Sequence, residues 1–156
     1  MLMNLTSESI KNGEAVWFGC EVAKRFAGKL GIQDLEIHNY KSAFGVEVNL
    51  GLSKADRLLY GESLMTHAMV FTATTLNESG TPEKWRVENS WGEDRGEKGY
   101  LLMTSEWFRE FVFEIVVDKK YVPEEVLAVF NQEPIVLPAW DPMGALARDV
   151  RSQLQF

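Results

Sequence analysis

Short apolar runs alternate with polar turns along the chain, and the spacing inside each run indicates the element that it forms. Apolar residues three or four positions apart predict helices, whereas dense β-branched and aromatic runs predict strands. Helices are expected at residues 2–11, 22–30 (a turn or two), 53–60, 105–109 and 123–130. Strands are expected at residues 14–22, 44–48, 66–74, 84–89, 99–103 and 111–118. Helices early in the chain and antiparallel strands after them predict an α+β fold.

Residues at the ends of these helices carry capping signals. Ser53 is expected to cap the helix at 53–60, with Ala55, Leu58 and Leu59 facing inward. Ser105 is expected to cap the helix at 105–109, and proline at the first position begins the helix at 123–130. The run "FVFEIVVD" that follows alternates less cleanly, which predicts a strand buried on both faces.

The composition is that of one folded domain. The chain has 156 residues, 46% of them hydrophobic and 25% charged, which is enough to bury a core. Sixteen basic and twenty-three acidic residues give a net charge of −7, which argues against a nucleic-acid partner because that affinity comes largely from lysine and arginine. No apolar run approaches the roughly 20 residues that span a bilayer, so no membrane partner is expected.

The cellular compartment is inferred from two absences in the sequence. The N-terminal residues lack the basic region and long apolar core of a signal peptide. A single cysteine, Cys20, excludes an internal disulfide and fits a reducing compartment. The cytoplasm is therefore the expected location. Two histidines, His38 and His67, without a carboxylate cluster at ligand spacing give no case for a metal, and no cofactor is expected.

His67 is the strongest candidate for chemistry, because it lies in the apolar strand "THAMVFTAT". Asn89 ends a neighbouring strand, and if the two strands pair, its amide oxygen can accept a hydrogen bond from one ring nitrogen of His67. The other nitrogen is then left for a nucleophile. Trp91 is placed to cover that bond and keep water from it. The alternative from the residues alone is a core histidine bonded to a backbone carbonyl. His38, in "EIHNYK", is expected to be a solvated loop residue.

The order of several motifs points to one family. "HAM" followed by "WRVENSWGEDRGEKGY" resembles the histidine and asparagine segments of papain-like cysteine peptidases. "GESLMTHAM", "KGYLLMTSEWF" and "LPAWDPMGALA" agree in order and spacing with the C-terminal portion of the bleomycin hydrolases, a family within that group. The resemblance runs from about Asn12 to Ala147. It implies the β-rich, barrel-like half of a papain-like fold, with short flanking helices and an extended C-terminal arm.

The resemblance also implies roles for the site residues. His67 would be the general base, Asn89 would orient it, and Trp91 would shield their contact. The family nucleophile lies in a Gln-x-x-x-Cys-Trp motif at the start of a helix, and this sequence contains no such motif. Cys20, in the strand "AVWFGCEV", is interpreted as a structural, unreactive thiol. We therefore expect the chain to be the C-terminal part of the enzyme, a truncated product or a fragment, and inactive alone.

The expected organisation has three parts. Residues 1–130 form the His/Asn domain, 131–147 the extended arm, and 148–156 an atypical tail. In the family, the arm lies in the cleft, and its terminal carboxylate meets the amine of the substrate, which makes the enzyme an aminopeptidase. The tail departs from the family pattern. Trimming, a loss of exopeptidase behaviour, a change of reading frame near Arg148 and a tag without a role are all left open.

Two functions are weighed. The first is the His/Asn part of a cytosolic thiol aminopeptidase, which releases N-terminal residues from peptides and assembles as a homohexamer. The second is a non-catalytic module that binds peptides or takes part in assembly only. An upstream segment with the cysteine motif would favour the first function, and a genuine transcript that begins at Met1 would favour the second. Exposed apolar surface is expected where the helical domain would dock.

Overall fold

The structure is a computed structural model that describes residues 1–49 and 51–138. The chain divides into two compact units, Met1–Val122 and Pro123–Phe156. The first unit contains every strand of the described residues and both candidate site residues. The second unit contributes two short helices within its described part, residues 123–138.

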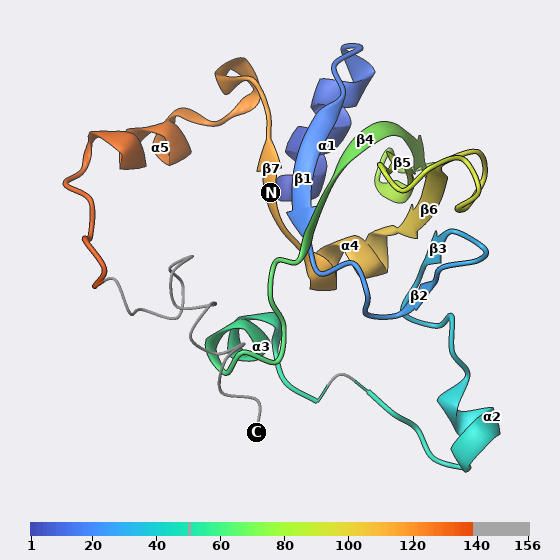
Figure 1. The fold of residues 1–156 in the computed structure, drawn as a ribbon. Helices are drawn as coiled ribbons and strands as arrows, with labels where there is room; N and C mark the ends of the chain where they lie inside the picture. Colours follow the sequence, from blue (N-terminus) through green and yellow to red (C-terminus); the bar gives the residue numbers. More distant parts are fainter. Residues whose placement is uncertain (50, 139–156) are drawn as a thin grey trace. The chain divides into compact units, whose positions relative to one another are not determined.

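A curled sheet of seven strands forms the first unit, in the order β2-β3-β6-β5-β4-β1-β7 (Figure 1). Neighbouring strands are antiparallel except β3 and β6, which are parallel. The strands are β1 Val16–Cys20, β2 Phe26–Ala27, β3 Ile32–Gln33, β4 His67–Leu76, β5 Pro82–Glu88, β6 Tyr100–Thr104 and β7 Val112–Val116. Figure 1 shows β4 bending strongly along its length, and register shifts interrupt its pairing with β5.

The helices of both units are short. In the first unit they are α1 Leu2–Lys11, α2 Tyr40–Phe44, α3 Lys54–Leu59, α4 Ser105–Phe111 and the 3-10 helix η1 Lys119–Tyr121. In the second unit they are α5 Glu124–Leu127 and the 3-10 helix η2 Ala128–Asn131. Residues 132–138 form neither helix nor strand. Within the described residues, no helix has the length and apolar character needed to cross a bilayer.

Aromatic side chains from the sheet and from α4 dominate the core. Phe18 and Phe71 stack with ring centroids 3.8 Å apart, and Phe108 of α4 lies 5.1 Å from the rings of both Phe71 and Trp85. Trp85 is fully buried, and its indole N–H donates to the Ser105 hydroxyl at 3.0 Å. This satisfied indole lets a large ring occupy the core without an unpaired donor.

The structure confirms the α+β class, the helix at 2–11 and most of the predicted strands. The helix expected at 22–30 is wrong. Phe26 and Ala27 instead pair with Gln33 and Ile32, and the two strands of this hairpin have two residues each. Sheet pairing overrides the weak helical signal. The strand expected at 44–48 is also wrong. Asn39 caps the helix α2 there, and Gly45, at φ 74°, ends that helix in a left-handed turn.

Capping and burial differ from expectation in four further places. Ser53 does cap α3, accepting from the Asp56 N–H, but Ala55 and Leu59 are exposed and the buried residue is Arg57. Thr104, rather than a serine, caps α4. The strand β7 is buried only at Val112, and its other positions alternate between half-buried and exposed, since it lies at the edge of the sheet. The predicted helix at 123–130 is split into α5 and η2, with Pro123 at the cap rather than at the first helical position.

The predicted domain boundaries stay predictions. The first unit ends at Val122, whereas the predicted His/Asn domain ends at residue 130. The described part of the predicted arm, residues 131–138, is largely exposed. The rest of the arm and the tail at 148–156 lie outside the described residues.

Candidate active site

The candidate site lies where two rows of core residues end in polar side chains. Alternate residues of β4 face the core, and the row Phe71–Met69 continues to His67 at the start of the strand. Along β5 the row Trp85–Val87 continues to Asn89, one residue past the strand end. Strand alternation thus places both polar side chains at the same end of the core.

His67 and Asn89 form the predicted hydrogen bond, with 2.8 Å between His67 Nε2 and Asn89 Oδ1. The Ser90 backbone N–H also donates to Asn89 Oδ1, at 2.9 Å. A backbone N–H can only donate, so the atom between these two nitrogens must be the amide oxygen. Nε2 of His67 must then carry a proton, which leaves the lone pair of a neutral imidazole on Nδ1. Among the described residues, Nδ1 has no hydrogen-bond partner.

Trp91, which the sequence predicts to cover the His67–Asn89 bond, lies against the imidazole of His67. Its ring stacks on His67 with centroids 4.7 Å apart and an interplanar angle of 29°. On its far side the indole meets Phe26 of β2, at 6.2 Å between centroids. Because the indole is still 42% exposed, it shields one face of the imidazole and leaves its own outer edge to solvent. The sequence does not predict the contact between Phe26 and Trp91, because it predicts a helix at residues 22–30 in place of the β2–β3 hairpin.

Cys20 is close to His67 in the sheet but is a poor nucleophile. The two residues are paired across β1 and β4. The thiol is fully buried, and no hydrogen bond joins its sulfur to the imidazole in the described structure. Burial, with a smaller effect of the Glu21 charge, raises the pKa of Cys20 from 9.0 to about 12. A thiol in this state is almost entirely protonated at neutral pH, and the thiolate is the reactive form.

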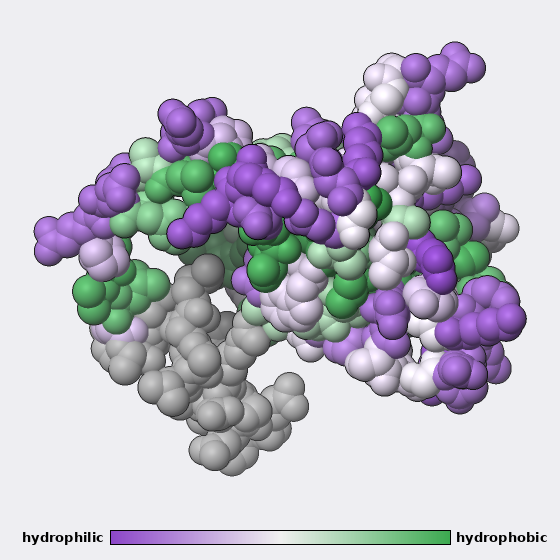
Figure 2. Space-filling model, turned by 90° about the horizontal axis from the view of Figure 1, so that it is seen from above, coloured by the Kyte–Doolittle hydropathy of each residue, from purple (hydrophilic) through white to green (hydrophobic). Residues whose placement is uncertain are grey.

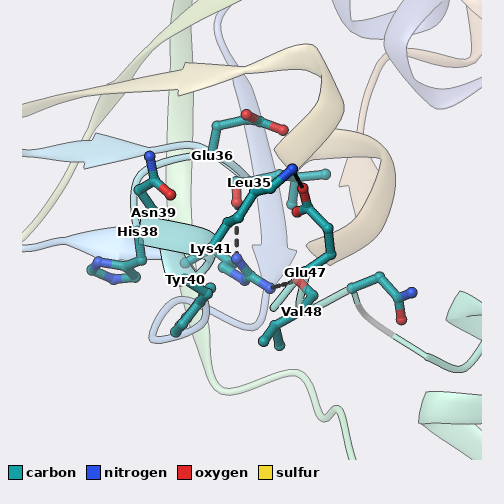
Figure 3. A pocket seen from close by; sticks show the side chains of 10 residues that line it. Leu35, Glu36, His38, Asn39, Tyr40, Lys41, Glu47 and Val48 are labelled. Carbon is teal, nitrogen blue, oxygen red and sulfur yellow. Dashed lines mark hydrogen bonds and ion pairs between the residues drawn. The ribbon is translucent and has the colours of Figure 1, made fainter. Parts of the chain in front are cut away.

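The other histidine lies in a different part of the first unit. His38 is exposed, as predicted, and lines a cavity of about 570 Å³ bordered by α2 (Figure 3). Among its lining residues, Arg25 donates to the carbonyl oxygens of Leu35 and Val48. Lys41 forms an ion pair with Glu47 (Figure 3). Neither His67 nor Asn89 lines it. The described residues contain no cluster of three or more potential metal ligands.

Comparison with known proteins defines the class to which this fold and site belong. The model of the Peptidase C1-like family matches residues 1–144, and the chain belongs to that family. Bleomycin hydrolase from Gallus gallus is 65% identical over 150 residues, which cover 95% of this chain and 33% of that protein. Aminopeptidase C from Lactococcus lactis subsp. lactis is 46% identical over 143 residues, 92% of this chain and 32% of the relative.

A solved structure agrees with these relatives. The crystal structure of PepW from Lactobacillus rhamnosis superimposes with a TM-score of 0.82 at 46% identity, covering 92% of this chain and 32% of that one. The chain is therefore homologous to bleomycin hydrolases and spans about a third of the length of the relatives that it matches.

Proposed function

We propose that this chain supplies the His/Asn half of a thiol aminopeptidase active site. The observation that carries the proposal is the His67–Asn89 hydrogen bond, which leaves a basic Nδ1 without a partner in the described residues. An imidazole fixed in one tautomer, with its free lone pair at the end of the core, is the arrangement that a general base requires. The homologous proteins named bleomycin hydrolase and aminopeptidase C support peptide bonds as the target.

The nucleophilic thiol is proposed to come from polypeptide outside these 156 residues. The sequence has one cysteine, and Cys20 is buried with its pKa raised to about 12. In the proposed reaction, Nδ1 of His67 takes the thiol proton, and the thiolate attacks the carbonyl carbon of the peptide. The imidazolium then returns the proton to the leaving amine. Water, activated by the same nitrogen, cleaves the thioester and regenerates the thiol.

The Nε2–Asn89 bond serves both halves of this cycle. While the imidazole is neutral, the bond holds the tautomer in which Nδ1 is basic. When the imidazole becomes charged, the same amide oxygen accepts from a cationic donor, and such bonds are stronger than neutral ones. Stacking by Trp91 keeps the ring plane fixed through both states. We propose peptides as substrates, the cytoplasm as the compartment and a homohexamer as the assembly of the complete enzyme.

One observation favours the alternative of a non-catalytic assembly or peptide-binding module. Hydrophobic side chains reach the surface in several places between hydrophilic ones (Figure 2). Several exposed ones fall between α2 and the end of α3, namely Phe44, Val46, Val48, Leu52, Leu59 and Tyr60. Such surface is typical of an interface. This surface also fits a docking face for the rest of a peptidase, and the Nδ1 of His67, which has no partner among the described residues, supports catalysis over the alternative.

A chimaera tests the proposal. This chain replaces the matching third of Gallus gallus bleomycin hydrolase, to which it is 65% identical, and hydrolysis of a fluorogenic aminoacyl amide is measured. His67→Ala should lower kcat/KM by at least about 1000-fold, the scale of general acid–base catalysis. His38→Ala, at the only other histidine, is the matched control and should leave the rate unchanged. Equal rates for both variants would refute the role of His67.

A further inference from the structure

The buried carboxylate of Glu21 contacts the segment that precedes His67 in the chain. Glu21 follows Cys20 at the end of β1 and is only 8% exposed. Its Oε2 accepts a short hydrogen bond from the Ser63 hydroxyl and a second, at 3.3 Å, from the Leu64 N–H. Within the described residues Glu21 takes part in no ion pair. Burying a carboxylate without a nearby cation costs free energy, and these two hydrogen bonds offset that cost.

The segment between Ser63 and His67 is held on both sides of this carboxylate. The Thr66 N–H donates to the Cys20 carbonyl at 2.9 Å, and the Val22 N–H donates to the Thr66 hydroxyl at 3.2 Å. Upstream, the Ser63 N–H donates to the carbonyl of Arg57 at 3.0 Å. Glu21 therefore provides a side-chain anchor for this segment, beside the backbone hydrogen bonds and the bond to the Thr66 hydroxyl.

His67 is the first residue of β4, so its backbone orientation depends on how this segment enters the sheet. Its ring reaches Asn89 through a single hydrogen bond of 2.8 Å. A hydrogen bond weakens steeply with misalignment, so a small rotation at the strand start would separate Nε2 from Oδ1. The direction of the ring is thereby coupled to the position of Ser63 and Leu64.

We infer that Glu21 is a positioning residue, whose carboxylate holds residues 63–66 so that the His67 ring meets Asn89. The inference rests on the proposed function, in which that bond fixes the basic nitrogen. Glu21 contacts no reacting atom and acts through His67. An amide of the same shape can accept the same two hydrogen bonds through its oxygen, so the geometry rather than the charge of Glu21 is what the segment needs.

The test measures the bond itself in the isolated chain. In ¹⁵N-histidine-labelled protein, NMR reports the tautomer of His67 and the solvent-exchange protection of its Nε2–H proton. Glu21→Ala should reduce that protection by about tenfold, the scale of the hydrogen bonding that the substitution removes, and mix the two tautomers. Glu21→Gln should largely restore both signals. Ser105→Ala is the matched control. It removes a buried hydroxyl that accepts from the Trp85 indole and donates to the Pro82 carbonyl, and both of these partners lie outside residues 63–66.

The outcomes separate the inference from the proposed function. A wild-type His67 without a protected Nε2–H would refute the proposed tautomer itself. A protected wild-type signal that Glu21→Ala leaves unchanged would overturn only the positioning role. A signal lost equally in Ser105→Ala would also overturn it, because the effect would then follow stability alone. If Glu21→Ala does not fold, Ser63→Ala decides: a loss of about threefold supports the role, and unchanged protection overturns it.

Discussion

Replacing Asn89 by alanine should separate activity from stability. In the wild type, Asn89 Oδ1 accepts two hydrogen bonds, from His67 Nε2 at 2.8 Å and from the Ser90 N–H at 2.9 Å. Losing them costs about 1 kcal/mol each. The amide nitrogen of Asn89, however, is buried without a partner in the described structure, and such a donor itself costs about 1–3 kcal/mol. The variant removes both contributions, so the free energy of unfolding should change by less than about 1 kcal/mol.

Activity should respond far more strongly to the same substitution. Without the amide oxygen, the imidazole of His67 is free to rotate and to exchange tautomers, and misplacement on the scale of about 1 Å costs on the order of 100-fold in rate. We therefore expect kcat/KM of the chimaera to fall by about 100-fold, while urea unfolding of the isolated chain is nearly unchanged.

A second asparagine provides the control for this prediction. Asn77 Oδ1 accepts from the N–H groups of Ser79 and Thr81 at 3.0 and 2.8 Å, in an exposed turn. Asn77→Ala should cost about 1 kcal/mol of stability and leave kcat/KM unchanged. If Asn89→Ala instead destabilised the chain by more than about 3 kcal/mol and kept its activity, Asn89 would be a structural residue and the reasoning would be refuted.

Three further predictions concern the scaffold. Arg57→Met should lower the free energy of unfolding by about 3 kcal/mol in urea titrations, because it leaves Glu110 without its 2.6 Å ion-pair partner; a loss under about 0.5 kcal/mol would contradict this. Because the pKa of Cys20 is raised from 9.0 to about 12, the unfolded chain loses this proton first, so the Cys20 contribution to stability should fall as pH rises from 9 toward 12, and Cys20→Ser should make the slope of stability against pH less negative in that range. Gly19→Ala should cost about 1–2 kcal/mol, since the new methyl group meets the Met65 sulfur, and thermal unfolding should show the cost reduced when Met65→Ala is added.

The sequence predicted the site better than it predicted the loops. The alternation that ends at His67 and Asn89 is a local pattern, and pairing of the two flanking strands was enough to bring the side chains together. Arg57 shows the opposite case. The sequence predicts that other residues of its helix face inward, whereas Arg57 is the buried one. The carbonyl of Leu52 and the carbonyl and carboxylate of Glu110, 53 residues away, accept hydrogen bonds from its guanidinium.

Long-range contacts also explain why the sequence does not predict the roles of Phe26 and Glu21 near the site. Phe26 supports Trp91 because two residues of β2 pair with β3, a contact too short to leave a periodic signal. Glu21 lies near the end of the strand predicted at residues 14–22, and nothing in the sequence marks it as a positioning residue. Its burial depends on Ser63 and Leu64, more than 40 residues later, and no spacing rule links those positions.

The central claim is that His67 serves a nucleophile outside this chain. It is tested most directly by measuring hydrolysis of a fluorogenic aminoacyl amide by the isolated chain and by the chimaera, each with and without Cys20→Ser. We predict no turnover by the isolated chain in either form, and equal turnover by the chimaera with and without the substitution. Turnover by the isolated chain that disappears in Cys20→Ser would contradict the account, because the buried thiol would then be the nucleophile.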